Sequence, residues 1–309
     1  MKMKKFISLL AVTTMVAGMA VGCGNSSSDS SSDATSTADS TEASADWDSS
    51  SDITIVSRED GSGTRGAFIE LFGIEEKDAS GEKVDNTTAD AQITNSTSVM
   101  LTTVAGDDYA IGYVSLGSLD DSVKAVKIDG ADATAENIKS GDYKVSRPFN
   151  IATKSDMNNE VASDFIAFIM SKDGQKVVED NGYIPVDDAK DFEGTNPSGK
   201  AVVGGSSSVS PVMEKLIEAY KTVNPNAEIE LQTTDSTTGM TSTIDGSYDI
   251  GMASRELKDE EKAELTSQVI ATDGIAVIVN KNNPTDELST EQVYNIYTGS
   301  ALTWDEVAK

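Results

Sequence analysis

The sequence predicts an α/β fold, because strand-like and helix-like segments alternate along the chain from Ile53 onward. Two further observations support this class. Three of the strand-like segments lead through a turn rich in Ser, Thr and Gly directly into a helical pattern. The 309 residues include one cysteine and no histidine, so neither disulfides nor thiolate metal sites are expected to hold the fold together.

The first element is a β-branched run that begins at Ile53 and ends in Arg58. The turn Gly61-Ser-Gly-Thr64 follows, and a helical pattern then begins. This layout places four groups at the N-terminus of a helix: Arg58, Ser62, the Gly63 amide and Thr64. Free backbone N–H groups and the positive end of the helix dipole favour a small oxyanion there.

Later elements follow the same alternation. Strands are expected at Ala110–Val114, Ala125–Ile128, Ala201–Val203, Glu228–Leu231, Tyr248–Gly251 and Ile275–Val279. Helices are expected at Ser96–Val104, Val161–Ile169, Gln175–Glu179, Val212–Tyr220, Lys258–Leu265 and Val293–Tyr297. The last helix opens with a capping box, in which Ser289 precedes Gln292 by three residues.

The N-terminus reads as an export signal over residues 1–22, with lysines before a short apolar run. Cys23 follows, in Ala20-Val21-Gly22-Cys23, which is the lipoprotein arrangement with alanine where leucine is usual. Residues 23–51 are rich in Ser and Asp and are expected to form a disordered tether. The alternative is a secreted protein whose single cysteine has no such role.

The composition excludes several functions. The 24 basic residues against 52 acidic ones give a formal charge of −28, which argues against nucleic-acid partners. Without histidine the commonest general base and metal ligand are missing, so we expect no catalytic residues, no metal and no cofactor. An anion must then be captured by local hydrogen bonds, since the overall field repels it.

Helix starts that could bind an anion occur at Gly61–Thr64, Gly204–Pro211 and Thr234–Gly239. Each offers hydroxyls and backbone N–H groups at a helix N-terminus. Taken singly, such residues are ordinary N-caps. Neither a Walker A motif nor the dinucleotide glycine fingerprint is present, so nucleotide binding is not supported.

Eight segments carry a resemblance to a known family. They are Ser57–Arg65, Ala110–Tyr113, Ser146–Phe149, Gly174–Gln175, Gly205–Leu216, Ile250–Leu257, Asp273–Asn280 and Ile296–Gly299. The chain resembles the phosphate-binding component of phosphate ABC transporters, in its Gram-positive lipoprotein form. The resemblance covers nearly everything after the tether. It implies the two-lobed periplasmic-binding-protein fold of type II, or Venus flytrap, with phosphate in the cleft between the lobes.

The resemblance also implies which residues bind the anion. Ser207 and Ser208 would donate from one helix start and Ser236 from another. From the other lobe, Arg58 would make a charge-assisted contact with Asp60 orienting it. The same turn would complete the site with Ser62, Gly63 and Thr64.

One position departs from the family pattern. Better-known members place an aspartate, which accepts the proton of hydrogen phosphate, where this chain has Arg255. We expect Asp273 to replace that acceptor and so to discriminate against sulfate, although it could also only cap a strand end. Arg255 itself could add positive charge near the anion, or pair with Glu256 or another surface acid.

The order of the segments is rotated relative to the family. The serine-rich helix start usually opens the mature protein, whereas here it follows the loop at residues 187–200. The chain is therefore interpreted as a circular permutant in which this linker joins the usual termini. Lobe 2 would contain residues 53–143 and 280–309, and lobe 1 residues 146–186 and 202–277. A rearranged or truncated tandem gene is the competing explanation.

The export signal and the family resemblance together imply an extracytoplasmic receptor, lipid-anchored at Cys23 to the outer face of the cell membrane. It would bind inorganic phosphate as a monomer and deliver it to an ABC permease. Two alternative functions remain. One is a phosphate-sensing or adhesive surface protein with the same fold, and the other is a phosphatase-like hydrolase that uses Ser62. The missing histidines oppose the hydrolase.

Overall fold

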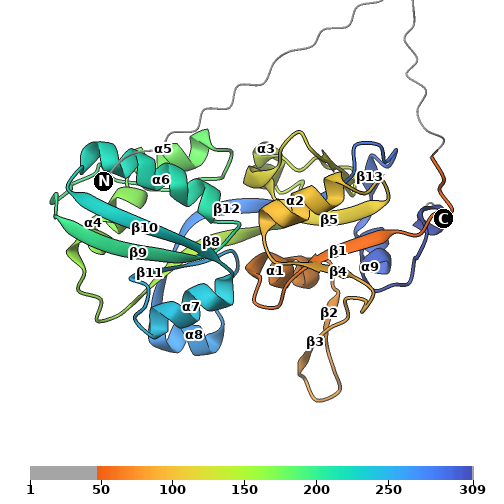
Figure 1. Ribbon diagram of the computed structural model, residues 1–309, viewed down its shortest axis with the longest axis horizontal. Helices are drawn as coiled ribbons and strands as arrows, with labels where there is room; N and C mark the ends of the chain where they lie inside the picture. The colour runs from red at the N-terminus through yellow and green to blue at the C-terminus, as the bar shows by residue number, and fades with distance from the viewer. Residues whose placement is uncertain (1–46, 308–309) are drawn as a thin grey trace, which may run out of the picture. The chain divides into compact units, whose positions relative to one another are not determined.

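Two adjacent strands connect the halves of the folded unit (Figure 1). They are β8 (Ser146–Lys154) and β12 (Leu265–Val279), and they pair antiparallel from Leu265 to Gly274. The computed structural model describes residues 47–307. The predicted signal at residues 1–22, Cys23 and the tether up to residue 46 lie outside the described residues, as do residues 308–309.

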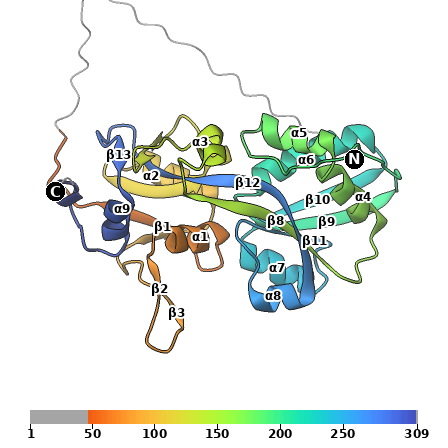
Figure 2. The same cartoon turned by 180° about the vertical axis from the view of Figure 1, so that it is seen from behind.

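Lobe 1 lies on the left in Figure 1 and on the right in Figure 2. Its strands are β9 (Gly199–Ser206), β10 (Ala227–Thr234) and β11 (Ile250–Ala253). Its helices are α4 (Glu160–Ile169), α5 (Lys172–Asp180), α6 (Ser210–Val223), α7 (Ser236–Ile244) and α8 (Asp259–Glu264).

Lobe 2 holds the first part of the described chain and its end. Its sheet strands are β1 (Thr54–Arg58), β4 (Gln92–Thr94), β5 (Ala110–Ser115) and β6 (Lys124–Ala125). Short pairs are formed by β2 (Glu75–Lys77) with β3 (Lys83–Asp85), and by β7 (Lys127–Ile128) with β13 (Glu287–Leu288). The helical elements are α1 (Gly63–Leu71), α2 (Thr97–Ala105), η1 (Leu116–Ser118), α3 (Ala135–Ser140), α9 (Thr290–Tyr297) and α10 (Trp304–Val307).

The main sheet is continuous across both lobes, in the order β10-β9-β11-β8-β12-β5-β1-β4, with β6 beside β12. The pairs β9–β10 and β9–β11 in lobe 1 are parallel, as are β1–β5 and β1–β4 in lobe 2. Parallel pairs with helical crossovers confirm the predicted α/β class. Within the described residues, no helix is both long and apolar enough to cross a bilayer.

The lobe boundary predicted after residue 277 is wrong. From Ile275 to Val279, β12 pairs with β5 of lobe 2, and Ile275 and Val277 belong to the lobe 2 core. The chain therefore passes from lobe 1 to lobe 2 at Gly274. The apolar run Ile275–Val279 is the last third of a 15-residue strand whose earlier part pairs with β8 in lobe 1.

The tether predicted to extend to residue 51 is also too long. Trp47 packs on Tyr109 and Trp304, with ring centroids 4.7 and 6.0 Å apart. The amide of Asp305 donates to the carbonyl of Ser49 at 2.7 Å. These contacts hold residues 47–51 on lobe 2, because the aromatic side chain gains burial that the surrounding Ser and Asp residues cannot provide.

The predicted linker at residues 187–200 is shorter and better held than expected. Gly199 and Lys200 belong to β9. Asp164 of α4 accepts hydrogen bonds from the amide of Thr195 at 2.6 Å and from Tyr220 Oη at 2.7 Å. The Asn224 amide donates to the carbonyl of Pro197 at 2.9 Å. Other predicted elements differ by a few residues, and the strand expected at residues 125–128 is split between β6 and β7.

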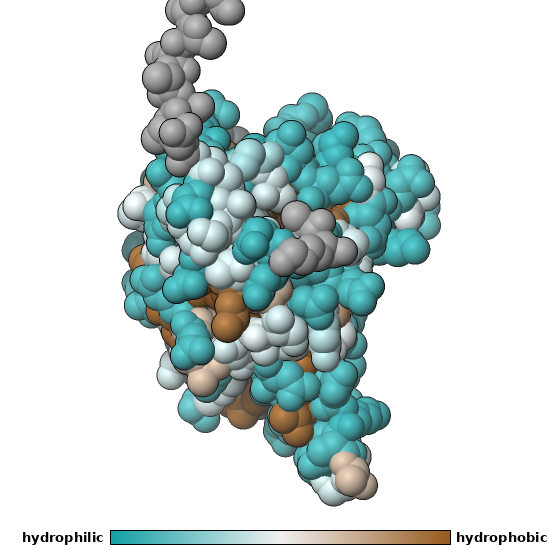
Figure 3. Space-filling view, turned by 90° about the vertical axis from the view of Figure 1, so that its right-hand side faces the viewer, coloured by the Kyte–Doolittle hydropathy of each residue, from teal (hydrophilic) through white to brown (hydrophobic). Residues whose placement is uncertain are grey.

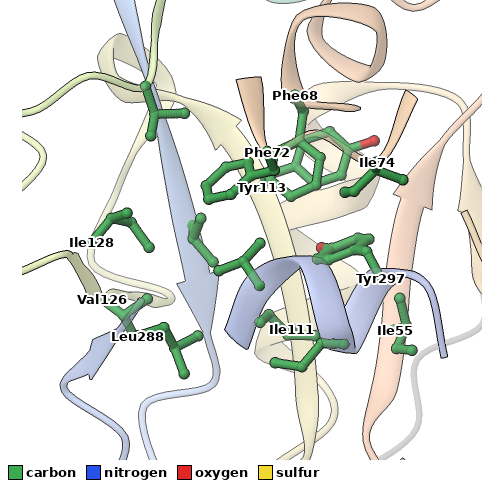
Figure 4. Packing of buried hydrophobic residues seen from close by; sticks show 14 of the residues in the cluster. Ile55, Phe68, Phe72, Ile74, Ile111, Tyr113, Val126, Ile128, Leu288 and Tyr297 are labelled. Atoms are coloured by element: carbon green, nitrogen blue, oxygen red, sulfur yellow. The ribbon is translucent and has the colours of Figure 1, made fainter. Parts of the chain in front are cut away.

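Each lobe has its own core, and the lobe 2 core fixes the end of β1 (Figure 4). Phe68 of α1 stacks on Tyr113 of β5 with ring centroids 3.9 Å apart. Tyr113 Oη accepts a hydrogen bond from the Arg58 amide at 3.1 Å and lies 2.9 Å from Ser57 Oγ. Tyr297 Oη donates to the carbonyl of Val56 at 3.1 Å. Because these phenols are buried, their polar ends must pair, and the pairing sets the position of Arg58.

Figure 3 shows one face that is mostly hydrophilic, with only small hydrophobic areas. Large hydrophobic side chains that are exposed in the described part are scattered over the sequence: Leu71, Val84, Ile93, Val99, Val223, Val269 and Leu302.

Candidate anion-binding site

Three helix starts meet between the lobes. In lobe 2, Ser62 is the N-cap of α1, and its hydroxyl accepts from the Arg65 amide at 3.3 Å. In lobe 1, Ser206 ends β9, Ser207 and Ser208 follow it before α6, and Ser236 is the first residue of α7. Asp235 caps α7 by accepting from the Thr238 amide at 2.9 Å. The Ser236 hydroxyl is therefore not used as the cap and faces the interlobe region.

Side-chain hydroxyls from both lobes form one buried group, which we call the hydroxyl cluster. It consists of Thr64, Thr97, Ser206, Ser207, Ser208, Ser236 and Ser254, each at most 7% exposed. Thr64 Oγ1 lies 2.7 Å from Ser208 Oγ, and Thr97 Oγ1 lies 3.2 Å from Ser207 Oγ. Ser206 Oγ donates to Ser254 Oγ at 2.9 Å. Hydroxyls both donate and accept, so this group can rearrange its hydrogen bonds around an anion.

Arg58 brings a positive charge to the cluster from lobe 2. It is 2% exposed, and its Nη2 donates to Ser207 Oγ at 3.1 Å. Its Nε and Nη2 also donate to the two carboxylate oxygens of Glu59, both at 2.8 Å. A bidentate pair of this kind fixes the plane of the guanidinium, which is what charge-assisted recognition of an oxyanion needs.

The predicted role of Asp60 in orienting Arg58 is wrong. Asp60 binds Arg65 Nη1 at 2.9 Å and its side chain is fully exposed. Arg65 also binds Asp85 and donates to the carbonyl of Arg58 at 2.9 Å. Glu59 orients Arg58 instead, because its carboxylate pairs with the guanidinium, whereas Asp60 lies in the exposed turn with Gly61.

Arg147 is a second buried cation at the cluster, 4% exposed. Its Nη2 donates to Thr64 Oγ1 at 3.1 Å and its Nε donates to the carbonyl of Ser254 at 3.0 Å. Its Nη1 donates to Asp273 Oδ2 at 2.5 Å. Burial raises the pKa of the Asp273 carboxyl above its usual range, and the positive charge of Arg147 opposes that rise.

Asp273 is thus separated from the hydroxyl cluster by Arg147. Its second oxygen, Oδ1, accepts from the Gly117 amide at 3.3 Å. Asp273 is 1% exposed. It lies inside β12, so it does not cap the end of a strand. The sequence predicts Asp273 as an acceptor for the anion, whereas in the structure its carboxylate pairs with Arg147.

Gly63 has a steric role as well as a backbone amide. A Cβ added there would lie 2.7 Å from Ser254 Oγ and would also overlap Ser236 Oγ. Only glycine lets the start of α1 approach the serines of lobe 1 this closely. Of the eight predicted binding residues, Arg58, Thr64, Ser207, Ser208 and Ser236 are joined to the hydroxyl cluster by hydrogen bonds, and Gly63 packs on it. Ser62 lies at the N-cap beside it and Asp273 behind Arg147.

Sequence reasoning missed Thr97, Arg147, Ser206 and Ser254 as site residues. Arg147, Ser206 and Ser254 stand in three of the segments that carry the family resemblance, so a signal for them was present. Thr97 had none, because it opens α2 in the manner of any threonine near a helix start. Arg255 follows Ser254 and forms a two-point ion pair with Glu261, so of the two expectations for Arg255 the pairing with an acid is confirmed, but the partner is the nearly buried Glu261 and not Glu256 or a surface acid.

A groove of about 740 Å³ lies beside the cluster, between the lobes. Ser62 and Arg147 line it together with residues of α1 and of the segment before α8. Among the described residues, no group of three or more acidic or cysteine side chains is arranged to hold a metal ion. Two buried guanidinium groups, several hydroxyls and a helix N-terminus suit a small tetrahedral oxyanion.

Comparisons with known proteins agree with this geometry. A family model for the PBP superfamily domain matches residues 19–173 and 192–309. The chain is 56% identical to the phosphate-binding protein PstS 2 of Streptococcus agalactiae over 311 residues, which cover 100% of both chains. It is 43% identical to the phosphate-binding protein PstS 2 of Streptococcus pneumoniae over 308 residues, 99% of this chain and 100% of that protein.

A crystal structure of the phosphate-binding protein of a phosphate ABC transporter from Streptococcus pneumoniae is also similar, with a TM-score of 0.65 and 46% identity. The similarity covers 83% of this chain and 100% of that one. The sequence alignments along whole chains and the structural similarity therefore both identify phosphate-binding proteins as relatives of this chain. The chain belongs to the PBP superfamily and, within it, to the PstS family of phosphate-binding proteins of ABC transporters.

Proposed function

We propose that this protein is an extracytoplasmic receptor that binds inorganic phosphate between its lobes and delivers it to an ABC permease. The observation that carries the proposal is the buried contact of Arg58 and Arg147 with hydroxyls of both lobes. Charge-assisted donors in a buried site bind an oxyanion more strongly than they would in water. An anion held there would bridge the lobes and stabilise their closure.

The proposed binding residues follow from their places in the site. Ser207, Ser208, Ser236 and Thr64 supply hydroxyls, Ser62 and Gly63 supply the helix start, and Arg58 supplies charge. Arg147 and Thr97 are added to the predicted set. That Asp273 accepts the proton of hydrogen phosphate stays a prediction, since its contact with the cluster runs through Arg147.

Two arginines of the same turn provide a matched test. Arg58→Met removes the buried cation, while Arg65→Met removes one whose side-chain partners are Asp60, Asp85 and the backbone carbonyl of Arg58, none of them a hydroxyl of the cluster. Equilibrium dialysis of the purified protein against labelled phosphate should show at least a hundredfold loss for Arg58→Met. The Arg65→Met protein should stay within about threefold of wild type. Equal losses, or full binding by Arg58→Met, would reject this site.

The membrane attachment and the oligomeric state are also proposals. A lipid at Cys23 would tie the protein to the outer face of the membrane, and the protein would act as a monomer, in keeping with the small hydrophobic areas on the one face that Figure 3 shows. Mass spectrometry of membrane-extracted protein tests the first, since a diacylglyceryl group must appear on the peptide that begins at Cys23. Sedimentation velocity tests the second.

The circular permutation remains a proposal that the chain ends support. Asp52 forms an antiparallel bridge with Thr303, and the Ile53 amide donates to the carbonyl of Leu302 at 2.8 Å. The first and last described segments therefore adjoin within lobe 2. A chain reopened in the loop at residues 187–198 and joined from Lys309 to Asp52 should fold and bind phosphate. If it does not fold, the permutant interpretation is wrong.

A sensing or adhesive role is the remaining alternative, because it would use the same site. Phosphate uptake by cells that lack the protein separates the two, since only a transport component is needed for uptake. The hydrolase alternative has no support, because the family consists of substrate-binding receptors.

A further inference from the structure

A second set of contacts joins the lobes at the groove, apart from the hydroxyl cluster. It consists of Glu261, Arg255 and Thr237 of lobe 1 and Gly61 of lobe 2, and we call it the mouth latch. Gly61, Thr237 and Arg255 line the groove of about 740 Å³ beside the site.

The base of the mouth latch is a nearly buried ion pair. Arg255 Nη1 and Nη2 each donate to one oxygen of Glu261 at 2.7 Å, and the two side chains are 12% and 7% exposed. Glu261 also accepts from the Lys258 amide at 2.8 Å, and Arg255 Nη1 donates to the carbonyl of Glu256 at 2.9 Å. These contacts fix the direction of Arg255, which donates to Glu261, Glu256 and Thr237 and not to a hydroxyl of the cluster, so it is not placed as a ligand for the anion.

Thr237 connects this pair to the other lobe. Its Oγ1 accepts from Arg255 Nη2 at 3.3 Å and donates to the carbonyl of Gly61 at 3.3 Å. One hydroxyl can do both, because it has one hydrogen and two lone pairs. The Thr237 amide donates to the same carbonyl at 3.2 Å. The chain of contacts from Glu261 thus ends on the turn that precedes α1.

The stem of Arg255 lies against the first turns of α1. A Cβ on Gly63 would come within 3.1 Å of Arg255 Cγ, and one on Gly66 within 3.9 Å of Arg255 Cδ. Because Gly63 and Gly66 have no side chains, the methylene groups of Arg255 fit against this part of α1. Apolar contact and hydrogen bonds therefore act together at this interlobe boundary.

None of the mouth latch contacts uses a hydroxyl of the cluster, so they can form with or without a bound anion. We propose that Glu261, Arg255 and Thr237 are positioning residues that must separate from Gly61 before an anion can leave. They thus set its rate of release. The inference rests on the proposed function, in that phosphate is the anion released.

Release kinetics test the proposal with two variants that break different links. Thr237→Val removes the hydroxyl and keeps the amide. The double variant Arg255→Met with Glu261→Gln keeps an apolar stem and leaves no unpaired buried charge. Stopped-flow measurement should show phosphate released about three to ten times faster from each, with the association rate within twofold of wild type.

The controls separate a latch from general destabilisation. Thr241→Val makes the same change on an exposed residue of α7, and its release rate should equal that of wild type. Combining Thr237→Val with the Arg255/Glu261 double variant should add little, because both break one relay. Release at the wild-type rate from both Thr237→Val and the double variant would overturn the proposal.

A measurement without phosphate keeps this inference distinct from the proposed function. If wild type binds no phosphate, the proposed function fails and release cannot be followed. Hydrogen exchange of the Thr237 amide in the ligand-free protein still reports the contact with Gly61. That amide should exchange several times faster in the Arg255→Met, Glu261→Gln variant than in wild type. Unchanged exchange would contradict the mouth latch.

Discussion

Arg147 and Asp273 are cross-strand partners where β8 and β12 pass between the lobes, and their side chains form a buried ion pair. The pair lies at the hinge, and Arg147 continues to Thr64 in the hydroxyl cluster. One residue thus connects the strands that join the lobes with the site between them. This connection gives the first prediction.

Asp273→Asn should destabilise the ligand-free protein by about 3 kcal/mol, because it leaves the Arg147 charge buried and unpaired. Urea unfolding without phosphate measures the loss. Asp286→Asn is the control, since it removes an exposed partner of Lys124 and should change nothing measurable. If Asp273 also accepts the proton of hydrogen phosphate, the variant loses its preference for phosphate over sulfate. An unchanged preference would exclude that role.

Thr97→Val should weaken phosphate binding by about tenfold, because Thr97 Oγ1 contacts both Ser207 and Ser208. The substitution leaves the packing around position 97 unchanged, since valine has nearly the same shape as threonine. Thr102→Val is the matched control on the exposed face of α2. Calorimetric titration of the two variants decides: comparable affinities would remove Thr97 from the site.

Trp47→Ala should lower the free energy of unfolding by about 1–3 kcal/mol, because the ring packs on Tyr109 and Trp304. The half-buried position keeps the cost below that of a core tryptophan. Leu302→Ala, at a side chain 54% exposed, should cost less than about 0.5 kcal/mol. Chemical denaturation compares the two variants. Equal stabilities for Trp47→Ala and wild type would show that residues 47–51 belong to the tether and not to the folded lobe.

Alkaline pH should destabilise lobe 2 through Tyr113. Burial raises the pKa of Tyr113 to about 12, above the value near 10 of an unfolded tyrosine. The folded state holds this proton more tightly. The stability it contributes is therefore complete below pH 10 and is lost as the pH rises towards 12.

The measurement is urea unfolding of wild type and Tyr113→Phe at several pH values from 9 to 12. Tyr113→Phe cannot titrate at this position, so its stability should fall less over the interval than that of wild type. The same fall in both proteins would show that Tyr113 does not contribute to the alkaline loss.

The parts of the fold that local patterns define were predictable. The β-branched run, the turn with glycines and the helical pattern of residues 53–71 reappear as β1 and α1. The capping box of Ser289 and Gln292 is present at α9. The length of β12 was not predictable, because its first part contains the exposed and mostly polar run Thr266–Val269, which shows no strand alternation, while its second half is buried.

The site was predictable where a residue stands in a turn and not where it depends on tertiary contacts. Ser207 and Ser236 lie at helix starts, which sequence patterns reveal. Arg147 lies within a strand, and its role follows only from its pairing with Asp273 across the sheet. The partner of Arg58 was misassigned between neighbours, because the direction of Glu59 and Asp60 depends on the turn at Gly61.

The central claim is that the hydroxyl cluster, with Arg58 and Arg147, binds phosphate between the lobes. Isothermal titration of the purified protein at pH 7 with phosphate and then with sulfate tests it most directly. The account predicts one phosphate per chain and sulfate binding at least a hundredfold weaker. No heat with phosphate, or equal affinity for sulfate, would contradict it.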